Sequence, residues 1–345
     1  MNWHSALSPT KLAHALGIEA RALWDMCGNG IPDVLLQFGG GIGDELLLTT
    51  VARELKRRNR ALRIWQVSRA WQLLKCNPDY HRVFDMNHWP LRYTKMLSSR
   101  RLQLHYAIEK IPLEAEVPPA DHVLAILCRG AGLSGQIALR PYLNLTDTER
   151  AGGRRARRQI AIQCAGSDAN QVIARNKLWP AERFQTVVQQ IQTRWPDCTI
   201  IQIGGNADPA LPGTIDLRGK TSLRETAAVL SQSMCFIGTE GFLMHLARAV
   251  ECRSVIVFGG RVHSWQTGYA CNENLDSFVP CAPCWLWNAC DFDRFCMTNI
   301  KPDHVVAAVD RAIDKFGTPL ATDTVELDAP PVSAPRPDTS LATSA

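Results

Sequence analysis

Short apolar runs alternate with stretches of helical periodicity along most of the chain, and the first clear example begins near residue 33. Residues 33–38 form an apolar run with the length of a buried strand, and residues 39–43 are rich in glycine. In residues 44–58 leucine and valine recur at helical spacing, and residues 62–67 form a second apolar run. This order predicts a strand, a turn, a helix and a strand, which is the βαβ unit of a parallel sheet.

The same alternation begins again after a polar, basic segment at residues 146–158. Residues 159–164 are predicted as a strand and residues 165–177 as a loop, and Pro180 stands where the first turn of a helix tolerates proline. Ser222 and Glu225 have the spacing of a capping box and predict a helix start. Further strands and helices are expected at residues 198–203, 234–238, 243–250 and 254–258. This α/β order favours two successive sandwiches that face each other across a cleft.

The two ends of the chain differ from its centre. Residues 1–30 have helical spacing and are expected to be accessory helices, before a first domain at residues 31–150 and a second domain at residues 151–316. Within the second domain, residues 300–316 predict a closing helix. Residues 317–345 are rich in proline, threonine, serine and alanine, so we expect a disordered tail.

Composition narrows the class of protein. Of the 345 residues, 46% are hydrophobic and 21% are charged, which is typical of a folded globular protein. No apolar run approaches the roughly 18 residues that cross a bilayer, and residues 1–17 lack the pattern of an export signal. We therefore expect a cytoplasmic protein whose 12 cysteines are reduced thiols.

The net charge of +5 is modest, but basic residues occur in clusters at residues 56–63, 100–101 and 154–158. Each cluster could contact anionic lipid of an inner membrane or a phosphorylated glycan, and each could equally be a solvated helix end or a charged linker. The sequence has neither a zinc-finger spacing nor an aromatic and basic pattern, so nucleic acid is not an expected partner.

The glycine-rich turn at residues 39–43 follows a predicted strand and opens a helix, which presents free backbone N–H groups to an anion. It is not a dinucleotide-binding fingerprint, because Leu46 occupies the third glycine position and Ile64 stands where a ribose-binding acid is expected. This disfavours a Rossmann dehydrogenase. From its position alone, Asp44 is interpreted either as a helix N-cap or as a catalytic carboxylate. Residues 165–177 and 238–245 form two similar turns in the second domain.

Three segments together carry a resemblance to a known family. They are GGGIGDELLLTTVARELKRR at residues 39–58, NKLWPAERF at residues 176–184 and DLRGKTSLRETAAVLSQSMCFIGTEGFLMHLARAV at residues 216–250. With these segments, and with CAPCWLWNACDFDRFCM near the C-terminus, the chain resembles glycosyltransferase family 9, the bacterial lipopolysaccharide heptosyltransferases, over residues 31–316. The resemblance implies the GT-B fold, in which two Rossmann-like domains face across a cleft and the second binds most of the donor. It also implies metal-independent transfer with inversion at the anomeric carbon.

The resemblance implies roles for residues of the first two turns. Asp44 matches the family's general base, and Gly43 beside it belongs to the substrate-binding residues. A carboxylate with a reference pKa of about 3.9 is ionised at neutral pH and can accept the proton of the acceptor hydroxyl. In the second turn, Gly166 and Ser167 are expected to bind the donor pyrophosphate, and Lys177 to stabilise the charge of the leaving group.

The third turn departs from the commoner pattern of the family. Its Gly241, Phe242 and Leu243 are expected to point their N–H groups at a phosphate. Glu240 stands in place of the aspartate that contacts the donor sugar, and Phe242 stands in place of a glycine. A carboxylate is kept, but it is one methylene longer, so the identity of the sugar stays open.

Two residues near this turn have two interpretations each. His245 lies one helical turn further, where it is either a phosphate contact or a packed, hydrogen-bonded histidine. Thr221 lies near where the family places the nucleotide base, and its alternative role is to precede a helix that Ser222 caps.

Four cysteines lie close together in the sequence, at Cys281, Cys284, Cys290 and Cys296. Their CxxC start and compact spacing are compatible with a tetrahedral zinc or iron site, and also with buried free thiols, so a metal there stays open. Asp291 and Asp293 formally make the DxD of metal-dependent glycosyltransferases, but their position after the second sandwich argues against that role.

We therefore expect an inverting transferase that needs no cofactor for catalysis. It moves a heptose from ADP-heptose to a lipopolysaccharide core or a related lipid-linked glycan, in the cytoplasm or at the cytoplasmic face of the inner membrane. The alternatives are a family-9-like transferase with another nucleotide sugar or with a protein or capsule acceptor, and a non-catalytic nucleotide-sugar-binding protein.

Overall fold

The computed structural model describes residues 31–38, 40–89, 96–97, 100–106, 109–110, 115–164 and 174–328, together with five positions between residues 17 and 28. Those five positions are helical, and the remainder of the predicted accessory helices lies outside the described residues. Gly166 and Ser167 of the second turn also lie outside them, as do residues 329–345 of the predicted tail.

The first domain is built on a four-stranded parallel sheet in the order β3-β2-β1-β4. Its elements are β1 (Val34–Phe38), α2 (Ile42–Arg58), β2 (Ile64–Ser68), α3 (Trp71–Leu74), β3 (Arg82–Asp85) and β4 (Arg101–Leu104). β1 is central, because Val34 pairs with Ile64 of β2 and Leu35 pairs with Arg101 of β4. The predicted βαβ unit is confirmed.

The charged end of α2 is occupied by contacts within the domain. Arg57 and Arg58 pair with Glu54 at 2.9 and 2.8 Å, and the Lys56 ammonium donates to the carbonyl of Arg60 at 3.1 Å. Basic side chains in the last turn of a helix also interact favourably with its dipole. Of the two interpretations of this basic cluster, these contacts favour the helix end.

The remaining strands of the first domain form two small antiparallel pairs. β5 (Glu109–Lys110) pairs with β6 (Ala115–Glu116), and β7 (Gly135–Ala138) pairs with β14 (Thr324–Leu327). Between them, α5 (Val123–Gly130) buries Val123, Leu124 and Leu127 in the core beside α2.

The strand β14 corrects the prediction of a disordered tail that begins at residue 317. Thr324 pairs with Ala138, and Leu327 pairs with Gly135 and is buried. The composition of the tail gave no sign of this, because the partner strand lies far away in the sequence. The C-terminal part of the chain therefore returns to the first domain.

The second domain is built on a six-stranded parallel sheet in the order β10-β9-β8-β11-β12-β13. Its strands are β8 (Gln159–Ile162), β9 (Thr199–Gln202), β10 (Ile215–Asp216), β11 (Phe236–Thr239), β12 (Ser254–Gly259) and β13 (Glu273–Asp276). Its helices are α7 (Ala181–Arg194), α8 (Leu223–Ser231), α9 (Phe242–Ala249), α10 (Ser264–Thr267), α11 (Phe295–Thr298) and α12 (Pro302–Asp314). β8, β11 and β12 are buried along their whole length, as expected for strands that helices cover on both faces.

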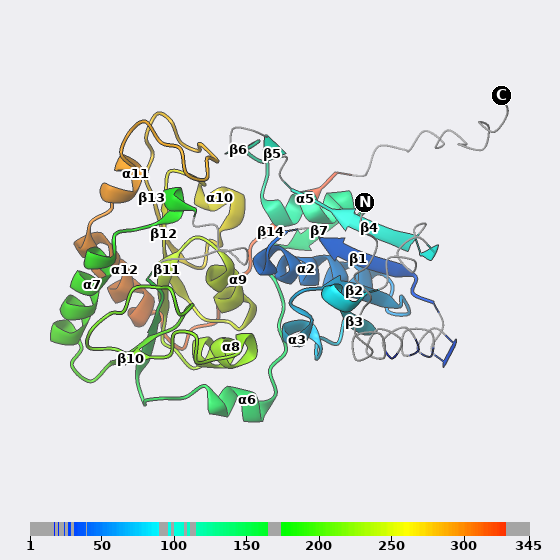
Figure 1. The fold of residues 1–345 in the computed structure, drawn as a ribbon, viewed down its shortest axis with the longest axis horizontal. Helices are drawn as coiled ribbons and strands as arrows, with labels where there is room; N and C mark the ends of the chain where they lie inside the picture. Colours follow the sequence, from blue (N-terminus) through cyan, green and yellow to red (C-terminus); the bar gives the residue numbers. More distant parts are fainter. Residues whose placement is uncertain are drawn as a thin grey trace, which may run out of the picture.

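Figure 1 shows the two sheets side by side, with α2 and α9 between them. One apolar cluster joins side chains of α7 and α12, and a second continues from α8 and α9 into the first domain. The predicted capping box at the start of α8 is confirmed, because the Glu225 N–H donates to the Ser222 hydroxyl at 3.3 Å and the Ser222 N–H donates to the Glu225 carboxylate at 2.7 Å. None of the described helices is long and apolar enough to span a membrane.

A buried arginine holds the two domains together. Arg224 of α8 donates to the carbonyls of Leu73 and Asn144, both at 2.7 Å. Its guanidinium also grips the carboxylate of Glu149 through two hydrogen bonds of 2.6 and 2.7 Å. Glu149 lies in α6 (Asp147–Gly152), the short helix between the two sheets. This network fixes α8 to α3 and to the interdomain segment.

Candidate active site

The first and third glycine turns meet at the boundary between the domains. α2 starts beyond the carboxyl end of β1, and α9 starts beyond the carboxyl end of β11. A Cβ atom placed on Gly43 would lie 3.4 Å from the Cα of Phe242 and 3.7 Å from the imidazole of His245. The two turns therefore approach each other closely, and residues that the sequence predicted in separate domains lie side by side.

Asp44 lies half-buried in the first turn of α2, with both carboxylate oxygens engaged. Oδ2 accepts the N–H of Gly41 at 2.8 Å, and Oδ1 accepts a short hydrogen bond from the Tyr106 hydroxyl. Burial raises the pKa of Asp44; Tyr106, Gly41 and the charge of Lys177 oppose that rise, whereas Glu240 adds to it. Charges of the second domain therefore influence the pKa of Asp44. Tyr106 was not predicted from the sequence.

Lys177 and Glu240 form an ion pair at the carboxyl ends of the strands of the second sheet. The ammonium lies 2.6 Å from Oε2 of Glu240, and the two side chains are 27% and 8% exposed. Lys177 ends the short 3₁₀ turn Arg175–Lys177, and Glu240 directly follows β11. Burial raises the pKa of Glu240, but Lys177 and Arg261 outweigh it and hold that pKa below its usual range, so Glu240 is a carboxylate.

The start of α9 supplies the backbone groups of the third turn. Gly241 is its N-cap with φ at 151°, a value that favours glycine, and no side chain caps the helix. The N–H groups of the first turn of a helix have no acceptor within it, so those at Phe242 and Leu243 are suited to an anion. Phe242 is half-buried and Leu243 is buried.

His245 lies inside α9 and is buried. One ring nitrogen, Nδ1, is 2.7 Å from the hydroxyl of Tyr269, and the two rings stack edge to face. Burial lowers the pKa of His245 to about 4, so its imidazole is neutral at physiological pH.

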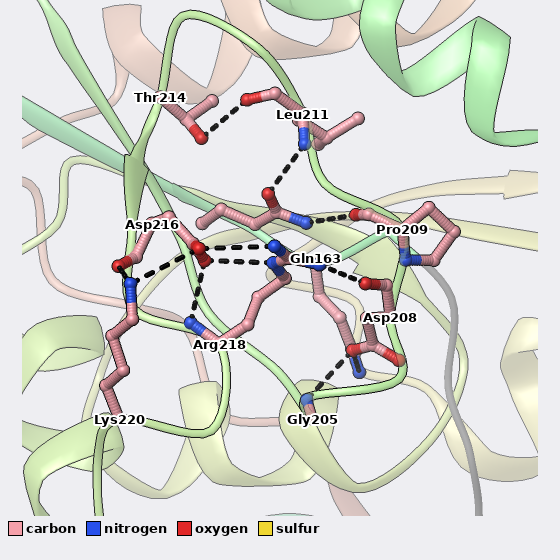
Figure 2. Close-up of polar contacts among 10 residues, drawn as sticks. Gln163, Gly205, Asp208, Pro209, Leu211, Thr214, Asp216, Arg218 and Lys220 are labelled. Atoms are coloured by element: carbon pink, nitrogen blue, oxygen red, sulfur yellow. Dashed lines mark hydrogen bonds and ion pairs between the residues drawn. The ribbon is translucent and has the colours of Figure 1, made fainter.

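The segment that follows β9, with the short strand β10 in it, is joined by polar contacts (Figure 2). Arg218 donates to the carboxylate of Asp216 at 2.9 Å and to the carbonyl of Asp208, whose own carboxylate accepts the N–H of Gly205 at 3.0 Å. Thr221 comes directly after this segment, half-buried, with its hydroxyl 2.8 Å from that of Thr226. The contact with Thr226 holds the Thr221 side chain against the start of α8.

A cavity of ≈ 530 Å³ lies between the domains on the β2 side of this site. Arg69, Trp71 and Lys75 line it from the first domain, and Ser222 and Arg224 line it from the second. β2 is the neighbour of β1 in the sheet, and Ala70, which lines the cavity, donates its N–H to the carboxylate of Glu45 at 3.0 Å.

The four clustered cysteines lie beyond β13, packed against the backbone that follows β12. Cys281 is exposed and the other three are half-buried; all four are free thiols. Burial raises the pKa of Cys284 and of Cys296, which favours the protonated thiol. Within the described part of the chain, no group of three or more His, Cys, Asp or Glu side chains is arranged to hold a metal ion. Asp293 lies in a turn with φ at 47° and does not end a strand.

Known proteins resemble this chain in fold and, over part of its length, in sequence. Residues 136–284 match the model of glycosyltransferase family 9 (heptosyltransferase). Escherichia coli ADP-heptose LPS heptosyltransferase II is similar with a TM-score of 0.58 and 12% identity, over 82% of this chain and 99% of that one. A family 9 glycosyltransferase from Veillonella parvula is similar with a TM-score of 0.60 and 13% identity, over 82% of this chain and 97% of that one. The dodecameric, iron-containing heptosyltransferase TibC was solved with ADP-D-beta-D-heptose. It is similar with a TM-score of 0.63 and 16% identity, over 82% of this chain and 76% of that one. No curated protein matches the sequence.

The fold is therefore GT-B, as predicted, with two Rossmann-like domains. The resemblance to glycosyltransferase family 9 is confirmed, on residues 136–284. Lys177, Thr221 and the third turn lie inside the matched segment. Asp44 lies outside it, so its assignment depends on the geometry of the first domain.

Proposed function

We propose that the protein is an inverting, metal-independent glycosyltransferase that uses a nucleoside-diphosphate sugar. The observation that carries the proposal is the close approach of Gly43 to Phe242, because it brings Asp44 of one domain near Lys177 and Glu240 of the other. A carboxylate opposite a cation and free helix N–H groups suits a reaction in which a hydroxyl attacks and a diphosphate leaves.

The donor is held by the second domain in this proposal. Lys177 and the N–H groups of Gly241, Phe242 and Leu243 bind its diphosphate, with Gly166 and Ser167 completing the turn, and Thr221 lies beside the base. These groups stabilise the negative charge of the departing diphosphate without a divalent ion. Glu240 and His245 line the site, and the carboxylate of Glu240 accepts hydrogen bonds from sugar hydroxyls.

Asp44 is the general base. As the acceptor oxygen forms its bond to the anomeric carbon, Asp44 takes the hydroxyl proton, and the bond from that carbon to the diphosphate oxygen breaks with its electron pair on the diphosphate. Attack opposite the leaving group inverts the anomeric centre. A carboxylate whose pKa burial has raised is a stronger base than one in water.

The donor we propose is ADP-heptose, and the acceptor is a lipopolysaccharide core or a related lipid-linked glycan. Support comes from the relatives, since TibC was solved with ADP-D-beta-D-heptose and the E. coli relative is an LPS heptosyltransferase. In this proposal the acceptor enters through the cavity between the domains on the β2 side. Because Glu240 and Phe242 depart from the common family pattern, the alternative is another donor sugar, or a protein or capsule acceptor. Measuring the melting temperature of the protein with each of a panel of nucleotide sugars identifies the donor, because the true donor should raise it most.

Replacing Asp44 tests the proposal. Asp44→Asn keeps the size and the Gly41 contact, so ADP should still bind by calorimetry while turnover falls by about 10² or more. Full turnover in this variant contradicts the role of Asp44. Donor binding by the unchanged protein with no transfer to any membrane extract favours a non-catalytic binding protein.

We further propose that no metal takes part in catalysis. Turnover in excess chelator should equal turnover without it, and a loss restored by Mn²⁺ contradicts this. TibC is described as iron-containing, so elemental analysis of the purified protein separately tests whether the four clustered cysteines hold zinc or iron.

A further inference from the structure

Arg261 is a buried cation beside the proposed donor site that the mechanism above does not use. It follows Gly259 and Gly260 at the carboxyl end of β12 and is only 2% exposed. β12 is the neighbour of β11, and the Glu240 N–H donates to the carbonyl of Val257 at 3.3 Å. Arg261 and Glu240 therefore follow the carboxyl ends of two neighbouring parallel strands.

The cysteine-rich loop holds Arg261 in place. The guanidinium lies over the rings of Trp285 and Trp287, at 5.3 and 5.1 Å, and its Nε donates to the carbonyl of Leu286 at 3.1 Å. The backbone N–H of Trp285 in turn donates to the backbone carbonyl of Arg261 at 3.0 Å. Aromatic faces and carbonyls stabilise a guanidinium away from water.

The loop also packs tightly on the backbone just before Arg261. A Cβ atom on Gly260 would lie 2.8 Å from the Cβ of Cys296 and 3.2 Å from that of Ala282, so no larger residue fits without movement. The CAPCWLWNAC segment, together with Cys296, therefore packs around Gly260 and the side chain of Arg261.

Two cations come from the segments that follow the strands on either side of β11, which ends just before Glu240. Lys177 follows β8 and Arg261 follows β12, and both lower the pKa of Glu240. Asp44 and the neutral His245 also face this group. A carboxylate that loses its sole cation inside a protein is strongly destabilised, whereas one with a second cation is not.

Lys177 contacts one group in the structure and a different group in the proposed function. In the structure its ammonium is engaged with Glu240 at 2.6 Å, but in the proposed function it serves the diphosphate. We propose that Arg261 is a positioning residue, which keeps the Glu240 carboxylate in place when Lys177 turns to the diphosphate of a nucleotide donor. The inference depends on the proposed function of Lys177.

Calorimetric titration of ADP into four forms of the full chain tests this: the unchanged protein, Arg261→Gln, Glu240→Gln and the double variant. Arg261→Gln should bind ADP at least about tenfold more weakly, because Glu240 then competes for Lys177. Glu240→Gln should bind at least as tightly as the unchanged protein. The double variant should regain the affinity that Arg261→Gln loses, because no carboxylate is left behind.

The results distinguish a failure of the inference about Arg261 from a failure of the proposed donor site. Weak binding that persists in the double variant overturns the inference, because Arg261 then either contacts the nucleotide itself or only supports the fold. Arg261→Lys, which keeps a cation, should retain most of the affinity, and equal loss in Lys and Gln variants also overturns it. If the unchanged protein binds none of ADP, GDP and UDP, the proposed donor site fails and the inference fails with it.

Discussion

The hydroxyl of Tyr106 donates a hydrogen bond to Oδ1 of Asp44, although the two residues are 62 positions apart. Tyr106 follows β4, and its ring packs on that of Phe38 at the end of β1, with centroids 5.7 Å apart. With Oδ2 held by Gly41, the carboxylate is fixed in one orientation.

We expect Tyr106→Phe to move the acidic limb of the pH profile of kcat/KM to higher pH. The hydroxyl lowers the pKa of Asp44, so its loss raises that pKa, and the ionised base then forms only at higher pH. kcat near neutral pH should fall about tenfold. Tyr80→Phe is the matched control, because the described residues offer the Tyr80 hydroxyl no hydrogen-bond partner. An unmoved acidic limb in Tyr106→Phe argues against Asp44 as the titrating base.

The size of residue 43 should decide whether the domains can meet. Gly43→Ala adds a Cβ at ordinary contact distance from Phe242 and should keep most of the turnover. Gly43→Val adds further methyl groups towards that backbone, so turnover should fall at least about tenfold, and ADP affinity should fall as well, because Phe242 belongs to the proposed diphosphate-binding turn. Steady-state kinetics and calorimetry on the pair measure this, and equal turnover of Ala and Val forms contradicts it.

Loss of Lys177 should act on donor binding. Lys177→Met removes a charge-assisted contact to the diphosphate, so the Kd for ADP should rise about ten- to a hundredfold. Lys220→Met is the control, since Lys220 is 59% exposed and pairs with Asp216. Comparable losses in both variants indicate a general charge effect and contradict a specific role of Lys177.

The Arg224–Glu149 pair predicts a stability that depends on pH. The hydrogen bonds from Arg224 are the largest influence that lowers the pKa of Glu149, to about 2. A lowered carboxylate pKa means that the contribution is fully present above the unfolded value near 4.5 and is lost as pH falls towards 2. Glu149→Gln should lower the free energy of unfolding by about 1–2 kcal/mol at pH 7, with partial solvent screening. Urea titrations of both forms from pH 7 to pH 3 should show this difference shrink, and a constant difference contradicts the assignment.

Local patterns revealed a large part of this fold, and long-range contacts account for the rest. The strand and turn before Asp44 and the capping box of Ser222 were predictable, because spacing within a few residues determines them. Tyr106 and Arg261 were missed, because their partners come together only when neighbouring strands pair. Lys177 and Glu240 were singled out through a family resemblance, but their ion pair depends on the fold.

The strand β14 has a mechanical consequence. The chain crosses from the first domain to the second after β7 and crosses back before β14 pairs with it, so two covalent connections tether the domains. Two tethers leave rotation about the line that joins them as the easy relative motion, and they resist sliding and twisting. The buried Arg224 network and the apolar cluster shared by α2, α8 and α9 oppose even that rotation, so Asp44 and Lys177 keep their places on either side of the domain boundary.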